Sequence, residues 1–132
     1  GLEPKYSTEI ELQWINANKN TDYSEKELEA AVRKRFSKYP FVKVIKGIIP
    51  DILNTNSPKS IAFLHLDLNA GIAETKALDI LYERVEKNGI ILLDDYGRFE
   101  HMELFNAHNE WFKKNNQSIL ELPTGQGLVI KK

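Results

Sequence analysis

The sequence contains no cysteine, has almost no net charge and includes no long apolar run. Without cysteine the chain cannot form a disulfide framework, a thiolate zinc site, an iron–sulfur cluster or a cysteine nucleophile. Its 18 basic and 19 acidic side chains leave a net charge of −1, which argues against a nucleic-acid binder, because contacts to several phosphates need a basic excess. No run approaches the roughly 20 apolar residues that span a bilayer, and the N-terminus shows no secretory pattern. We therefore expect a cytoplasmic protein with neither a membrane nor a nucleic-acid partner.

The composition is typical of one globular domain. With 132 residues, 42% of them hydrophobic and 28% charged, the chain is expected to form a single α/β domain over residues 1–132. Residues 1–23 show no sustained period and predict an irregular entry segment. A capping box of Ser24 and Glu27 predicts the start of a helix over 25–38. The face of this helix that is expected to be buried carries Leu28, Ala31, Val32 and Phe36.

The rest of the chain alternates strands and helices. The Val- and Ile-rich run 41–49 predicts a strand. Residues 61–68 are apolar on both alternating faces except at His65, which is typical of a parallel strand covered by helices on both sides. The elements expected after it are a helix over 72–86 that stops at Asn88-Gly89, a strand over 89–93, a helix over 101–114 and a hairpin of 118–122 and 128–131. This order predicts an α/β fold with a C-terminal antiparallel β-hairpin.

Acidic side chains follow the two central strands. Asp67 ends the first strand, and Asp94 and Asp95 end the second. Ligands bind at the carboxyl ends of strands in open α/β sheets, and neighbouring strands about 4.8 Å apart would bring these carboxylates together. Such a cluster repels itself unless it holds a cation, and oxygen ligands favour Mg²⁺, Ca²⁺ or Mn²⁺ over Zn²⁺. The alternative is that Asp94 caps the next turn, Asp95 is solvated and Asp67 pairs with a lysine.

Other polar side chains lie near these acids in the sequence. Asn69 is suited either to contact a bound ligand or to cap the helix that follows. His101 is a candidate proton acceptor or a surface residue. We expect His65 to be a hydrogen-bonded core residue and His108 to lie on the surface. No glycine-rich turn follows any strand, so the chain has no recognisable nucleotide cradle.

Several segments resemble one protein family. The stretch 61–97, with Leu66-Asp67-Leu68-Asn69 and then Asp94-Asp95-Tyr96-Gly97, resembles the second half of class I S-adenosylmethionine-dependent methyltransferases of the macrocin O-methyltransferase kind. Residues 1–4, 46–53 and 122–131 are similar to three further segments of that family. The resemblance implies a Rossmann-like methyltransferase sheet that here lacks the first βαβ unit with its glycine-rich loop. It also departs from the family at Asn69, where the family has an acidic residue.

The resemblance implies a specific chemistry. It is the transfer of a methyl group from S-adenosylmethionine to a hydroxyl of a sugar or small natural-product-like acceptor. By resemblance, Asp67, Asp94 and Asp95 would bind Mg²⁺ or another hard divalent cation, which lowers the pKa of the acceptor hydroxyl. Asp67 and Asn69 are the expected cofactor contacts, and His101 is the candidate base.

The missing unit has a physical consequence. Strand 61–68 would lose a hydrogen-bonding neighbour, and an open apolar edge promotes association. We therefore expect the chain to be the C-terminal portion of a longer protein, or its edge to be covered by a second copy or by residues 41–49. A non-catalytic truncated α/β module or assembly domain, with solvated acids, is the alternative function. A phosphoacceptor receiver domain fits less well, because its acid pair follows the first strand.

Overall fold

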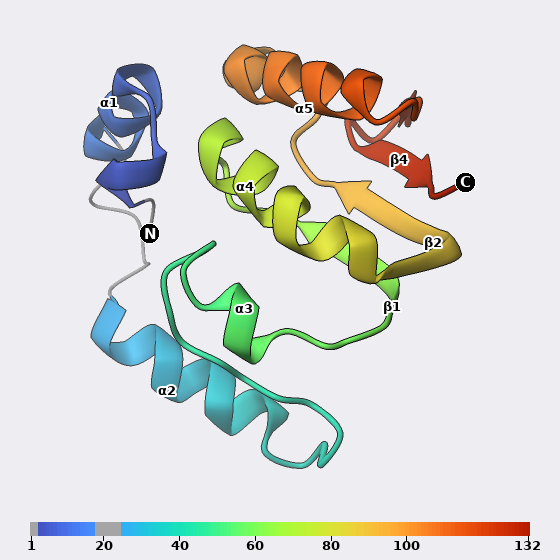
Figure 1. Cartoon of the computed structure of the whole chain (residues 1–132). Helices are drawn as coiled ribbons and strands as arrows, with labels where there is room; N and C mark the ends of the chain where they lie inside the picture. Colours follow the sequence, from blue (N-terminus) through green and yellow to red (C-terminus); the bar gives the residue numbers. More distant parts are fainter. Residues whose placement is uncertain (1–2, 18–24) are drawn as a thin grey trace.

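The computed structural model describes residues 3–17 and 25–132 (Figure 1). Its elements in chain order are η1 Pro4–Tyr6, α1 Glu9–Ala17, α2 Glu25–Phe36, α3 Leu53–Asn56, β1 Ile61–Leu66, α4 Gly71–Leu81, η2 Tyr82–Arg84, β2 Val85–Leu93, η3 Phe99–His101, α5 Met102–Lys114, β3 Leu120–Glu121 and β4 Gly127–Ile130. This succession confirms the predicted α/β fold. None of the helices in the described ranges has the length and hydrophobicity that a membrane crossing requires.

A four-stranded sheet in the order β1-β2-β4-β3 forms the centre of the fold. β1 runs parallel to β2, whereas β4 is antiparallel to both β2 and β3. The β3–β4 pair is therefore the predicted C-terminal hairpin. In the parallel pair Leu66 lies opposite Leu93, so β1 and β2 end side by side and the residues after them share one edge of the sheet.

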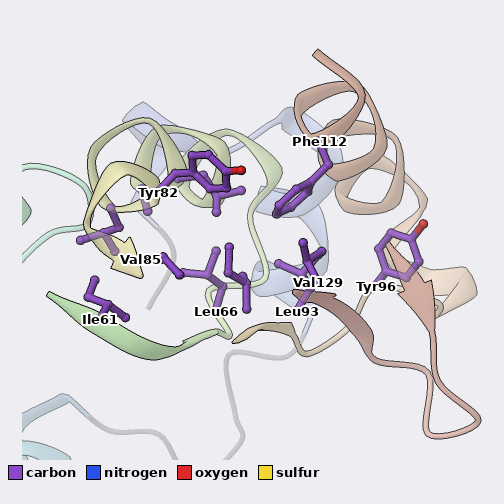
Figure 2. Packing of buried hydrophobic residues seen from close by; sticks show 12 residues of the cluster. Ile61, Leu66, Tyr82, Val85, Leu93, Tyr96, Phe112 and Val129 are labelled. Atoms are coloured by element: carbon purple, nitrogen blue, oxygen red, sulfur yellow. The ribbon is translucent and has the colours of Figure 1, made fainter. Parts of the chain in front are cut away.

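The hydrophobic core lies between one face of the sheet and the helices α4 and α5 (Figures 1 and 2). The helical spacing of Leu78 and Leu81 turns both side chains of α4 toward the sheet, and Phe112 does the same from α5. None of these three is more than 5% exposed, and Ile91 and Leu93 of β2 are fully buried beneath them. Burial of each such side chain stabilises the fold by about 1.5–3 kcal/mol. The core thus fixes which face of each strand is buried.

The opposite face of the sheet is partly exposed. Phe63, Ile90 and Ile130 are neighbours in register across three strands and are 58%, 38% and 55% exposed. Both helices of the core pack on the other face. The expectation that helices cover both faces of residues 61–68 is therefore wrong for the described chain.

The N-terminal part differs most from the sequence prediction. Residues 1–23, expected to be irregular, contain α1, and Thr8 and Glu11 form a capping box at its start. The backbone N–H of Glu11 donates to Thr8 Oγ1 at 3.2 Å, and the N–H of Thr8 donates to the Glu11 carboxylate at 2.7 Å. Residues 41–49 form no strand. They therefore add no strand to the outer edge of β1, which has a strand partner on one side only within the described chain.

Two helix predictions also need correction. The helix expected over 25–38 is present as α2, but Leu28 and Phe36 on its expected buried face are 44% and 38% exposed. The Ser24 cap lies outside the described residues. The helix expected over 72–86 ends earlier, because α4 stops at Leu81 and β2 already begins at Val85.

The expected helix stop at Asn88-Gly89 lies inside β2. Asn88 has a positive φ of 64°, and its N–H donates to the carbonyl of Lys131 at 2.8 Å. The pairing of β1 with β2 is irregular between Ile61 and Phe63. These features are those of a β-bulge, which accommodates the extra residues of β2 without ending the strand.

Candidate functional site

The three acidic side chains converge at the carboxyl ends of β1 and β2. The backbone N–H of Asp94 donates to the carbonyl of Leu66 at 3.0 Å, which extends the parallel pairing past the end of β1. One carboxylate oxygen from each of Asp67, Asp94 and Asp95 lies within 4.8 Å of the other two. Asp67 is exposed and the other two are half-buried. The expected convergence is present, and the spacing allows the three carboxylates to share one ion.

A hydrogen bond holds the carboxylate of Asp94 and an ion pair holds that of Asp95. Gln126 Nε2 donates to Asp94 Oδ1 at 2.8 Å, and Arg98 Nε lies 2.8 Å from Asp95 Oδ1. Burial raises the pKa of Asp67 above its ordinary value, and the negative charges of Asp94 and Asp95 raise this pKa further. The cluster therefore contains electrostatic repulsion that a bound cation would relieve.

Two histidines lie next to the cluster. His65 Nε2 is 3.4 Å from Asp94 Oδ1, and the His65 side chain is 41% exposed. The expectation that His65 is a core residue is wrong, because it shares the exposed face of β1 with Phe63. His101 Nε2 is 4.0 Å from Asp95 Oδ2, and its side chain is only 12% exposed. The structure thus places His101 beside the acidic loop, as expected from the sequence.

Two buried glutamates hold the turn that joins Asp67 to α4. Leu68 N–H donates to Glu74 Oε1 at 2.9 Å, and Gly71 N–H donates to Glu11 Oε1 at 2.8 Å. Between these contacts Asn69 adopts a positive φ of 56°, a conformation that asparagine tolerates better than most residues. Asn69 does not cap α4, because the N-cap position belongs to Ala70.

Behind this turn lies a buried pair that sequence reasoning missed. His108 Nε2 is 2.9 Å from Glu74 Oε2, and the two residues are 0% and 1% exposed. The His108 ring also stacks on Tyr96 at a centroid distance of 6.3 Å. The expectation that His108 lies on the surface is wrong. Its position four residues before Phe112, on the apolar stripe of α5, was the signal for burial.

The parallel strand pair, the antiparallel hairpin and the polar strand ends define a Rossmann-like α/β fold with its candidate site at the carboxyl edge of the sheet. The family model described as macrocin-O-methyltransferase (TylF) matches residues 3–122. The chain belongs to this family. No curated protein matches the sequence.

Solved structures show the same fold. The O-methyltransferase NovP aligns with a TM-score of 0.77 at 19% identity, over 100% of this chain and 56% of the NovP chain. A structure of CalS11, a TDP-rhamnose 3'-O-methyltransferase of calicheamicin biosynthesis, aligns with a TM-score of 0.55 at 16% identity, over 65% of this chain and 39% of that one. A second CalS11 structure covers 80% of this chain and 44% of its own, with a TM-score of 0.56 at 16% identity. The chain therefore spans little more than half of the NovP chain and less than half of CalS11.

Proposed function

We propose that the protein takes part in S-adenosylmethionine-dependent O-methyl transfer to a hydroxyl of a sugar or small natural-product-like acceptor, assisted by a divalent cation. Membership of the macrocin-O-methyltransferase family supports the reaction class. The names of NovP and of CalS11, an enzyme that acts on TDP-rhamnose, support an oxygen acceptor of this kind. The observation that carries the proposal is the convergence of Asp67, Asp94 and Asp95.

These three carboxylates fit a hard divalent cation. Their oxygens lie within 4.8 Å of one another, close to the about 4–5 Å that separates ligands on opposite sides of Mg²⁺ or Ca²⁺. Asp67, Asp94 and Asp95 would hold the ion. When bound, such an ion acts as a Lewis acid that lowers the pKa of an acceptor hydroxyl.

Nearby side chains would handle the proton and the methyl donor. His101, whose Nε2 is 4.0 Å from Asp95 Oδ2, would accept the proton of the acceptor hydroxyl, and Asp95 would stabilise the imidazolium that forms. Asp67 and Asn69 would contact the methyl donor at the end of β1. No glycine-rich loop occurs among the 132 residues, so the present chain supplies only part of a cradle for S-adenosylmethionine.

Calorimetric titration of the whole chain with MgCl₂ and MnCl₂ tests the cation site. We expect binding by the parent and a loss of at least about tenfold in affinity for Asp94→Asn. The matched control is Asp79→Asn. Asp79 lies in the last turn of α4 and accepts a hydrogen bond from Trp111 Nε1, and the side-chain oxygen of asparagine can accept the same bond. A parent that binds neither ion would overturn the metal assignment and favour a non-catalytic α/β module.

We also propose that residues 1–132 act as the C-terminal portion of a longer methyltransferase fold, whose missing unit covers the outer edge of β1 and the exposed apolar face. The chain's coverage of 56% of NovP and the edge position of β1 support this. Without that unit the chain should self-associate, and Phe63→Lys should weaken association in light scattering. Phe41→Lys is the control, because Phe41 is 83% exposed but lies outside the sheet. A parent chain that stays monomeric at every concentration would contradict the proposal.

A further inference from the structure

A cavity adjoins the acidic cluster. It has a volume of about 240 Å³ and is lined by Ile10 and Glu11 of α1, by Asn69 and by residues Phe99–Leu104 of η3 and α5. Two of these residues also belong to the surroundings of the cluster, since Asn69 follows Asp67 by two positions and His101 lies 4.0 Å from Asp95. The cavity and the cluster thus share Asn69 and His101 as neighbours, although the three aspartates do not line the cavity.

The described lining of the cavity is acidic. It contains the glutamates Glu11, Glu100 and Glu103, and among its described residues there is no lysine or arginine. Glu11 is only 8% exposed and already accepts hydrogen bonds from two backbone N–H groups, and Glu103 accepts one from the Thr8 hydroxyl. These two shape the local field, whereas the exposed Glu100 is able to pair directly with a cationic ligand.

Two features that attract anions are already compensated. The start of α5 carries the positive end of the helix dipole, which favours anions, but Glu103 occupies the first turn. Arg98 directly precedes the lining segment, yet its guanidinium pairs with Asp95 at 2.8 Å. A phosphate in the cavity would meet three carboxylates and no uncommitted arginine of the described lining.

The mouth of the cavity is apolar. Ile10, Phe99 and Met102 line it and are 60%, 90% and 47% exposed. An aromatic ring such as Phe99 packs against the C–H face of a sugar or another ring and attracts ammonium groups through its π-face. The volume of about 240 Å³ is below the about 300–1,000 Å³ of pockets for drug-sized ligands. The cavity therefore suits a single ring.

We propose that this cavity receives the methyl acceptor, and that the acceptor is a single-ring molecule with a protonated amine and no phosphate, such as an amino sugar. The amine would pair with Glu100 while the ring packs on Phe99. This rests on the proposed function for the acceptor role, but the charge preference of the cavity is measurable without transfer. A preference for a cationic ligand would distinguish this protein from an enzyme that acts on a sugar linked to a nucleoside diphosphate.

Titrations of the whole ¹⁵N-labelled chain with three probes test the proposal by NMR, without cation or methyl donor. The probes are methyl β-D-glucosaminide, methyl β-D-glucoside and TDP-glucose. We expect the glucosaminide to shift the backbone amide signals of Asn69, His101 and Glu103. It should bind at least about tenfold more tightly than the neutral glucoside, and TDP-glucose should not bind. Equal affinity for amine and neutral glycoside, or tighter binding of TDP-glucose at these amides, would overturn the proposal.

Two variants assign the preference to the cavity. Glu100→Gln should reduce the amine preference at least threefold, because it removes the exposed carboxylate. Glu110→Gln should leave it unchanged, since Glu110 pairs with Lys114 near the other end of α5. An equal effect of both would overturn the assignment to Glu100. If the chain binds Mg²⁺ but prefers TDP-glucose, only the present inference is refuted. If the chain prefers the amino sugar but binds no cation, the metal-assisted function is refuted and the charge preference of the cavity is supported.

Discussion

Replacement of Glu74 by alanine should destabilise the fold strongly. Glu74 is 1% exposed, and its two oxygens accept from Leu68 N–H and pair with His108 Nε2, each at 2.9 Å. Glu74→Ala leaves both partners without this acceptor in a dry environment. Removal of one member of a buried pair costs about 3–5 kcal/mol, which corresponds to a fall of about 12–20 °C in Tm at about 4 °C per kcal/mol.

Glu74→Gln tests the negative charge of Glu74 while keeping a side chain that can form both hydrogen bonds. The amide oxygen still accepts from Leu68, and its NH₂ can donate to a neutral His108 ring, so we expect a loss of only about 1–2 kcal/mol. Urea unfolding followed by circular dichroism gives both values for the whole chain. The double variant Glu74→Leu/His108→Leu should lose less than the sum of its single variants, because both polar partners are replaced together. The reasoning is refuted if Glu74→Ala costs less than about 1 kcal/mol or if glutamine and alanine have equal effects.

Three further changes test the core, the cluster and the hairpin. Phe112→Ala should lower the free energy of unfolding by about 3–5 kcal/mol, because Phe112 is 1% exposed in the core; a loss below about 1 kcal/mol in thermal unfolding would contradict this packing. The pKa of Asp67 is higher in the folded chain than in the unfolded chain. Between about pH 4 and this folded-state pKa the folded chain therefore binds more protons, and the contribution of this carboxyl to stability decreases as pH rises. Asp67→Asn should therefore gain stability relative to the parent from pH 4 upward, and urea midpoints that differ by a constant amount across pH would disprove it. Gly127→Ala should lower the free energy of unfolding by about 1–3 kcal/mol, because the added Cβ would lie 2.8 Å from Tyr96 Cγ. It should also displace Gln126 and so weaken Mg²⁺ binding in calorimetry. Unchanged stability would count against the close contact.

Local patterns predicted the central part of the fold. The doubly apolar runs at 61–68 and 89–93 correspond to β1 and to the end of β2, and the helical spacing of Leu78 and Leu81 corresponds to α4. Periodicity of this kind reports how a segment meets a hydrophobic partner. Because parallel strands end at one edge, the meeting of Asp67 with the two later aspartates was also predictable. Their roles as ligands, and that of His101 as base, stay predictions.

Features that depend on distant partners were not predictable in the same way. The Val- and Ile-rich run 41–49 has strand propensity, but this propensity is effective only beside a neighbouring strand, and the structure provides none there. His65 is exposed because the described helices leave its face of the sheet open, whereas His108 is buried because it lies on the inward stripe of α5. The contact of Gln126 with Asp94 joins residues that no local pattern connects. By contrast, the capping box of Thr8 and Glu11 was visible in the sequence.

The contact between Gln126 and Asp94 also affects when the site can assemble. Asp94 lies at the end of β2, whereas its amide donor lies 32 positions later, in the turn before β4. During translation the carboxylates therefore emerge from the ribosome well before the residue that orients one of them. A nascent chain that stops before Gln126 lacks this donor and should be unable to hold an ion with full affinity, so the competent site forms only after the carboxylates have been made.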